Sequence, residues 1–174
     1  MQEKQAPGIA AIAAKYGLIQ GVLGFCVFLG QVYTGTTQSR VGTAVSIAIL
    51  IVLMVLAHRE IKRTHKGMMT YAQGLGSGTL LATVSAVLSS VLTFIYVKFI
   101  NTGYISTVMH AQEAALQQRG ITGAQAQQAM AITGMIMNPV GIVLIALIGG
   151  IISGFIVALI VSIFTQKADP RAVV

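Results

Sequence analysis

Acidic residues are nearly absent from this chain, which carries only four Asp and Glu residues among 174. Charged residues of both signs make up 9% of the sequence, whereas hydrophobic residues make up 55%. A soluble domain normally carries about a quarter charged residues, so this chain has too few to cover a surface that faces water. The composition therefore predicts a protein that buries most of its surface in lipid.

Cysteine is also scarce, because Cys26 is the only one in the sequence. A single cysteine excludes an intramolecular disulfide and gives no information about the redox compartment. Cys26 lies inside an apolar run, where a thiol packs like a small hydrophobic side chain. We therefore expect no reactive or metal-binding role for it.

The shortage of acids leaves a net charge of +7. In a soluble protein such an excess suggests nucleic-acid binding, but in a membrane protein it is typical of loops that face anionic lipid. The basic stretch after residue 57 is about sixteen residues long and contains only one aromatic side chain, Tyr71, for base stacking. The sequence therefore predicts contact with a lipid bilayer and no nucleic-acid partner.

Four long apolar runs cover residues 14–33, 41–57, 74–100 and 140–164. A helix needs about 20 apolar residues to cross a hydrocarbon core, and these runs come close to that length. The runs predict an all-α integral membrane four-helix bundle that forms a single membrane domain over residues 1–174. No clear small-x-small cleavage site ends the first run, so we interpret it as an uncleaved span.

A more polar segment, residues 101–139, separates the third and fourth runs. Its Ala, Gln and spaced apolar residues predict two short helices, over residues 104–118 and 123–137. Thr122 is expected to cap the second helix, with Gln125 completing a capping box. The Met-rich second helix suits a cap over the bundle, with an interfacial helix or a partner groove as alternatives.

The distribution of cations predicts the orientation of the chain. With both termini in the cytoplasm, eight cations lie inside (Lys4, Lys15, Arg59, Lys62, Arg63, Lys66, Lys167, Arg171) and three outside (Arg40, Lys98, Arg119). This arrangement predicts a multi-pass protein of the bacterial inner membrane with an extracytoplasmic segment 101–139. It also predicts that Arg59, Lys62, Arg63 and Lys66 face anionic lipid headgroups.

The stretch from His58 to Gly78 also invites chemical interpretations. His58 and His65 stand two helical turns apart without a further ligand nearby, so solvated loop histidines are favoured over a metal site. The glycines of GLGSGT lack the Lys-Ser/Thr ending and the preceding strand of a phosphate loop. No Asp, Glu, Arg or His is expected well inside any span, so we predict no catalytic residue, no metal, no cofactor and no enzymatic activity.

Small residues recur at every fourth position in two of the runs. Such ladders allow helix backbones to approach closely in a membrane. One ladder comprises Gly74, Gly78, Ala82, Ala86 and Ser90, and the other Ala146, Gly150, Gly154, Ala158 and Ser162. We predict that both ladders are helix-packing surfaces, within one chain or between chains.

The segment KGMMTYAQGLGSG, with Gly67, Thr70, Tyr71, Gln73, Gly74 and Gly78, resembles part of a known family. Asn138-Pro139 and a final aliphatic run that ends in Gln166-Lys167 are similar as well. The chain resembles a bacterial domain-of-unknown-function family of four-span inner-membrane proteins, family 4199. The resemblance implies the architecture and the location, and implies no mechanism.

The sequence leaves three functions open. The favoured one is a non-enzymatic structural or accessory protein that packs against itself or within a larger membrane assembly. The alternative is a small channel or carrier for an uncharged solute, whose path would be lined by Gln20, Thr79, Thr83, Ser85, Ser89, Ser90 and Thr93. A lipid-sensing role of the basic stretch is a third interpretation.

Overall fold

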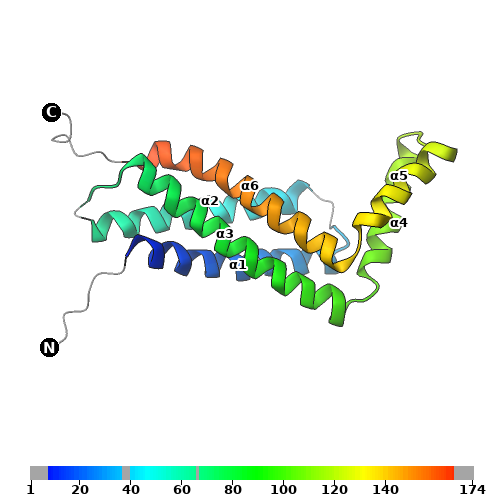
Figure 1. Ribbon diagram of the computed structural model, residues 1–174, viewed down its shortest axis with the longest axis horizontal. Helices are drawn as coiled ribbons and strands as arrows, with labels where there is room; N and C mark the ends of the chain where they lie inside the picture. Colours follow the sequence, from blue (N-terminus) through cyan, green and yellow to red (C-terminus); the bar gives the residue numbers. More distant parts are fainter. Residues whose placement is uncertain (1–7, 37–39, 66, 167–174) are drawn as a thin grey trace. The chain divides into compact units, whose positions relative to one another are not determined.

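The computed structural model describes residues 8–36, 40–65 and 67–166, and within these ranges the fold is helical. The helices, in chain order, are α1 Ile9–Tyr33, α2 Arg40–Thr64, α3 Tyr71–Ile95, the π-helical turn η1 Tyr96–Ile100, α4 Tyr104–Gln118, α5 Gly123–Ile136 and α6 Pro139–Thr165 (Figure 1). Four segments are long and apolar enough to cross a membrane, namely α1, α2, α3 with η1, and α6. The predicted all-α fold with four spans is confirmed, and the chain is a multi-pass membrane protein in contact with the bilayer.

The second span is longer than the sequence indicated. We expected it to end at Ala57, but α2 continues through Thr64. No Gly or Pro interrupts residues 58–64, and Arg, Glu and Lys are good helix formers. The chain turns only at Gly67, whose φ of 84° lies in the left-handed region that glycine tolerates. Residues 58–64 of the stretch that we interpreted as a loop are therefore the last two turns of a helix.

The start of α3 carries a capping box that the sequence analysis did not identify. The backbone N–H of Gln73 donates to Thr70 Oγ1 at 3.3 Å, and the backbone N–H of Thr70 donates to Gln73 Oε1 at 3.0 Å. These two bonds satisfy two backbone donors that the first turn of a helix leaves without a partner.

The other helix starts differ from one another. Asn138 Oδ1 accepts hydrogen bonds from the backbone N–H groups of Val140 and Gly141 at 3.1 and 2.9 Å, and Pro139 is the first residue of α6. Thr122 precedes α5, as expected, but its side chain makes no capping bond. The predicted capping box at Thr122 is therefore wrong.

The chain divides into two compact units, which we describe separately. Unit 1 comprises residues 1–89 and 147–174, and unit 2 comprises residues 90–146. The single membrane domain over residues 1–174 stays a prediction.

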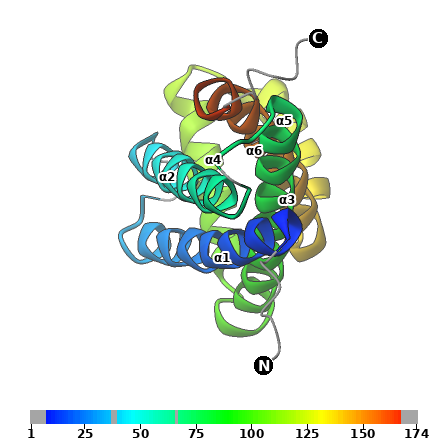
Figure 2. The same cartoon turned by 90° about the vertical axis from the view of Figure 1, so that its left-hand side faces the viewer.

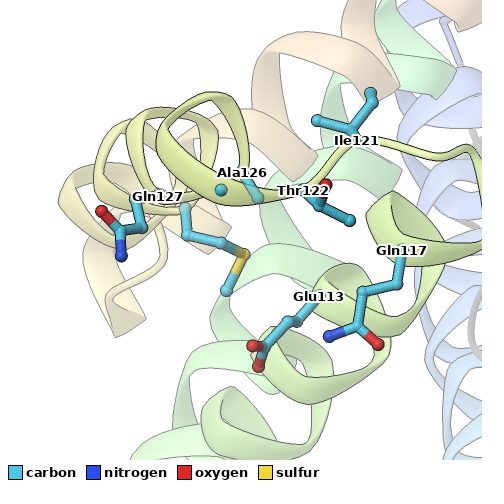
Figure 3. Close-up of a pocket in the computed structure, with 8 residues that line it drawn as sticks. Glu113, Gln117, Ile121, Thr122, Ala126 and Gln127 are labelled. Atoms are coloured by element: carbon cyan, nitrogen blue, oxygen red, sulfur yellow. The ribbon is translucent and has the colours of Figure 1, made fainter.

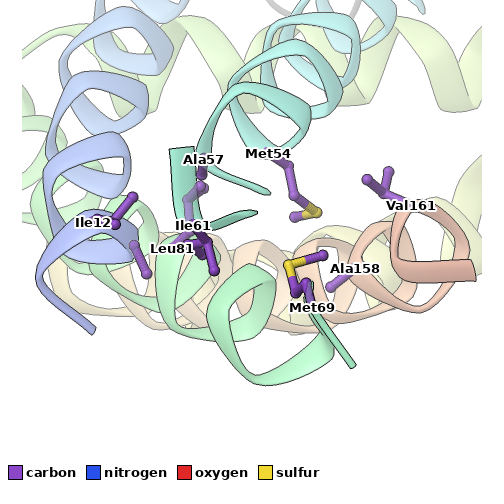
Figure 4. Packing of buried hydrophobic residues seen from close by; sticks show 9 residues of the cluster. Ile12, Met54, Ala57, Ile61, Met69, Leu81, Ala158 and Val161 are labelled. Carbon is purple, nitrogen blue, oxygen red and sulfur yellow. The ribbon is translucent and has the colours of Figure 1, made fainter. Parts of the chain in front are cut away.

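Unit 1 contains α1, α2, most of α3 and most of α6, which run lengthwise beside one another (Figures 1 and 2). The starts of α1 and α3 and the ends of α2 and α6 gather at the same end of this unit. We call this the four-helix end. The buried core is apolar and comprises Ile12, Ala13, Met54, Ala57, Ile61, Met69, Leu81, Ala158 and Val161 (Figure 4).

Unit 2 contains the end of α3, η1, the paired helices α4 and α5, and the start of α6. Gly120 and Gly123, with φ of 73° and 65°, shape the turn that joins α4 to α5. Leu116 is buried near the end of α4, whereas α5 has no fully buried residue.

Candidate functional site

His58 is the centre of a polar cluster at the four-helix end of unit 1. Its side chain is fully buried on α2 and contacts two other helices. Nδ1 lies 2.7 Å from Thr165 Oγ1 of α6, and Nε2 lies 3.1 Å from the carbonyl oxygen of Gly74 on α3. One imidazole ring therefore links three helices.

The partners of His58 determine where its hydrogens lie. A carbonyl oxygen only accepts, so Nε2 carries a hydrogen and donates it to Gly74. Thr165 Oγ1 is also within 2.8 Å of the carbonyl oxygen of Val161 on its own helix. The Thr165 hydroxyl has one hydrogen, which either that carbonyl oxygen or an unprotonated Nδ1 accepts. When Nδ1 accepts it, both ring nitrogens of the neutral histidine are bonded.

Lys62 and Ser162 complete the cluster. Lys62 Nζ donates to the carbonyl oxygen of Thr165 at 3.0 Å and so caps the end of α6, where a helix leaves carbonyl groups without partners. Ser162 is fully buried, and its hydroxyl has no hydrogen-bond partner among the described residues. The cluster thus contains one polar atom that is still unsatisfied.

The prediction of a solvated loop histidine is wrong for His58, which is buried in the last two turns of α2. Met54, Ala57 and Ile61 share the buried side of α2 with His58, and helical periodicity places all four on one arc. That spacing was the available sequence signal, and the density of nearby charges concealed it. His65 differs, because it is half-buried in the turn after α2 and bonds the carbonyl oxygen of Ile61 at 3.0 Å.

The small-residue ladders of α3 and α6 face each other within unit 1. A Cβ added to Gly78 would lie 2.8 Å from the Cβ of Ala158, and one added to Gly150 would lie 3.1 Å from the Cβ of Ala86. A Cβ at Gly154 would overlap the Cβ of Ala82. The helices therefore meet so closely that a side chain would displace its neighbour at Gly78 and Gly154 and would be tightly packed at Gly150.

Two further features concern the same ladders. A Cβ on Gly74 would lie 3.1 Å from Ser162 Oγ, so the ladder contacts run into the polar cluster. The remaining members, Ser90 and Ala146, belong to unit 2.

The first helix contacts both α3 and α2. On one side, an added Cβ at Gly17 would meet the carbonyl oxygen of Leu81 at 2.7 Å, so α1 lies close to α3. On the other side, Lys15 Nζ lies 2.6 Å from both carboxylate oxygens of Glu60 on α2, and the Tyr16 hydroxyl donates to Glu60 Oε2 at 2.8 Å. Together with the cluster, these contacts connect all four helices of unit 1.

The predicted headgroup-facing cations do not share one environment. Arg59 and Arg63 are exposed on the outer side of α2, whereas Lys62 is half-buried and bonds α6. Lys66 lies outside the described residues. The structure therefore separates a pair of outward arginines from a lysine that caps a helix.

Unit 2 contains a groove of about 510 Å³ between α4 and α5 (Figure 3). Its lining residues are Glu113, Gln117, Ile121, Thr122, Gly123, Ala126, Gln127 and Met130. The described residues contain no group of three or more His, Cys, Asp or Glu side chains placed to hold a metal ion.

A family model described as "Protein of unknown function (DUF4199)" matches residues 15–167. The chain belongs to the DUF4199 family. No curated protein and no solved structure matches it.

The motif that carried the DUF4199 resemblance has a structural explanation. Thr70 and Gln73 form the capping box that starts α3, and Gly67 provides the turn before it. Gly74 and Gly78 lie in the α3–α6 contact. In this DUF4199 chain the motif therefore starts a helix and allows its close packing.

Proposed function

We propose that the chain is a non-enzymatic structural or accessory protein of the bacterial inner membrane, which acts by assembling with other membrane subunits or with itself. One observation carries the proposal: α6 packs closely against α3 on one side and presents a broad apolar surface outward on the other. Helical spacing places Ile148, Ile152, Ile156 and Ile160 on one side of α6, and each is 50% to 56% exposed. This side lies opposite Gly150 and Gly154, which face α3.

The close contact between α3 and α6 favours assembly over the channel or carrier alternative. The overlap that any side chain at Gly154 would make with Ala82 leaves no space between α3 and α6 at that level. Two of the hydroxyls expected to line a path are engaged locally, since Thr79 Oγ1 donates to the carbonyl oxygen of Leu75 at 2.8 Å and Thr83 Oγ1 to that of Thr79 at 2.9 Å. Hydroxyls bonded to their own helix are poor ligands for a passing solute.

Catalysis is not part of the proposal. The buried histidine of unit 1 is bonded through both ring nitrogens, to Thr165 and to the carbonyl oxygen of Gly74. Neither nitrogen of His58 is open to a substrate proton. Glu60 is likewise held by Lys15 and Tyr16.

Affinity capture tests the assembly proposal. We expect the full-length protein, extracted from its native membrane in mild detergent, to migrate as a species larger than the monomer and to retain a stoichiometric partner or a second copy. Recovery as a free monomer at every expression level would contradict the proposal. In parallel, solute uptake into proteoliposomes above that of empty vesicles would favour the carrier alternative.

Cysteine labelling tests the proposed orientation, with both termini in the cytoplasm. Met68, between α2 and α3, and Gln125, on α5, are exposed. In a Cys26→Ala background, an impermeant maleimide should label Gln125→Cys in intact cells and should label Met68→Cys only after permeabilisation. Labelling of both positions in intact cells would contradict this orientation.

A further inference from the structure

Two arginines lie on the side of α2 that points away from the core of unit 1. Helical periodicity places Arg59 and Arg63 opposite Met54 and Ile61, which are fully buried. Both arginines are exposed. They belong to an apolar span, so their side of the helix faces the bilayer at headgroup level.

In the last turns of α2, Arg59 and Arg63 are the cations that remain available to bind a ligand from outside the protein. Lys15 is paired with Glu60, and Lys62 is bonded to the carbonyl oxygen of Thr165. Neither Arg59 nor Arg63 makes a hydrogen bond or ion pair with the described residues. Arg63 does lie within Coulombic reach of Glu60 and Tyr16, but that carboxylate already accepts from Lys15 and Tyr16.

The spacing of the two arginines suits one phosphate. Residues four apart on a helix have Cβ atoms about 5–6 Å apart, so two guanidinium groups can approach the same anion. Guanidinium groups bind phosphate oxygens in bidentate fashion. The neighbouring acid, Glu60, already accepts from Lys15 and Tyr16. Among the described residues, no free carboxylate therefore lies beside the arginines to bind the ammonium group of a zwitterionic headgroup.

An apolar stripe continues directly from the arginines along the same side of α2. It comprises Ala48, Val52 and Leu56, all of which are exposed. Ala48 lies eleven residues before Arg59, which corresponds to about 16 Å along the helix. One leaflet of a bilayer has a hydrocarbon depth of about 15 Å, so an acyl chain can follow the stripe while its headgroup lies at the arginines.

We propose that Arg59 and Arg63, with the stripe Ala48–Val52–Leu56, form a specific binding site for an anionic glycerophospholipid. The two guanidinium groups bind its phosphate, and the stripe contacts one acyl chain. The site depends neither on the assembly role nor on the orientation of the chain, because both leaflets present phosphates. A failure of either proposal therefore leaves this one standing.

Lipid retention by the full-length protein tests the site. Native mass spectrometry in nonionic detergent measures binding of phosphatidylglycerol, with phosphatidylcholine as the comparison lipid. We expect Arg59→Gln/Arg63→Gln to bind phosphatidylglycerol at least about tenfold more weakly than the parent, because charge-assisted hydrogen bonds are lost. Arg59→Lys/Arg63→Lys keeps the charge but not the bidentate geometry. Its affinity for phosphatidylglycerol should lie between that of the parent and that of the glutamine variant.

The matched control is Arg40→Gln/Arg119→Gln, which removes the same charge at exposed positions elsewhere and should bind like the parent. Four results would overturn the site: equal binding by Arg59→Gln/Arg63→Gln and the parent; full retention by the lysine variant; phosphatidylcholine binding as strong as phosphatidylglycerol binding; or displacement of the lipid by an equal concentration of inorganic phosphate. The last result would identify a site for a soluble anion rather than a lipid.

Discussion

Replacing Gly154 by alanine should destabilise the protein, although the same change normally stabilises a helix. In a helix interior, alanine is favoured over glycine by about 1 kcal/mol. At Gly154, however, the new methyl group would overlap the Cβ of Ala82 on α3. Overpacking of this kind costs about 1–3 kcal/mol, so we expect a lower midpoint of thermal unfolding in detergent, and a still lower one for Gly154→Leu.

The same helix supplies the control for this experiment. A Cβ added to Gly149 meets nothing within 4 Å, so Gly149→Ala should leave the midpoint unchanged or raise it. Because the contact lies within one chain, the oligomer size by chromatography should not change in Gly154→Ala. Equal midpoints for Gly154→Ala and Gly149→Ala would show that α3 and α6 do not meet at this level.

Replacing His58 by alanine should produce the second large loss of stability. The substitution leaves a cavity at a fully buried position and removes hydrogen bonds that connect α2 to Gly74 on α3 and Thr165 on α6. Cavity formation together with the lost buried bonds costs about 3 kcal/mol or more. The expected result is a midpoint well below that of the parent.

A glutamine at the same position tests whether the hydrogen bonds of His58 contribute to stability in addition to the volume that its side chain fills. The amide nitrogen of His58→Gln can reach the position of Nε2 and donate to Gly74, so this variant should recover part of the stability. His110→Ala, at an exposed position of α4, is the matched histidine control and should resemble the parent. The inter-helix role of His58 is contradicted if His58→Ala unfolds at the same midpoint as His110→Ala.

The spans could be predicted from the sequence because their signal is local. Each is a run of apolar residues of the length that a bilayer requires, and the structure places helices over all four. The bounds of α4 were also predicted, because Tyr104 and Gln118 enclose good helix formers before Gly120. The end of α2 was not predicted correctly. A run of charged residues indicates where an apolar stretch ends, but it does not indicate where a helix ends.

The polar cluster could not be predicted because its contacts join residues far apart in the chain. His58 and Thr165 are 107 positions apart, and no spacing rule connects them. Lys62 was grouped with Arg59 and Arg63 by charge alone, yet its position on α2 directs it toward the end of α6. The recurrence of small residues at every fourth position indicated the ladders. Which ladder packs against which could be seen only in the folded structure.

Photocrosslinking in the native membrane tests the proposed assembly most directly. A photoreactive amino acid at Ile152, on the outward side of α6, is compared with the same group at Val52, on the stripe of α2 that we assign to lipid. The two residues are both β-branched and 55% and 57% exposed. We expect a discrete protein adduct from Ile152, either with a second copy or with a partner, and only lipid adducts from Val52. Lipid adducts alone from Ile152, and from its neighbours Ile148 and Ile156, would contradict the assembly role.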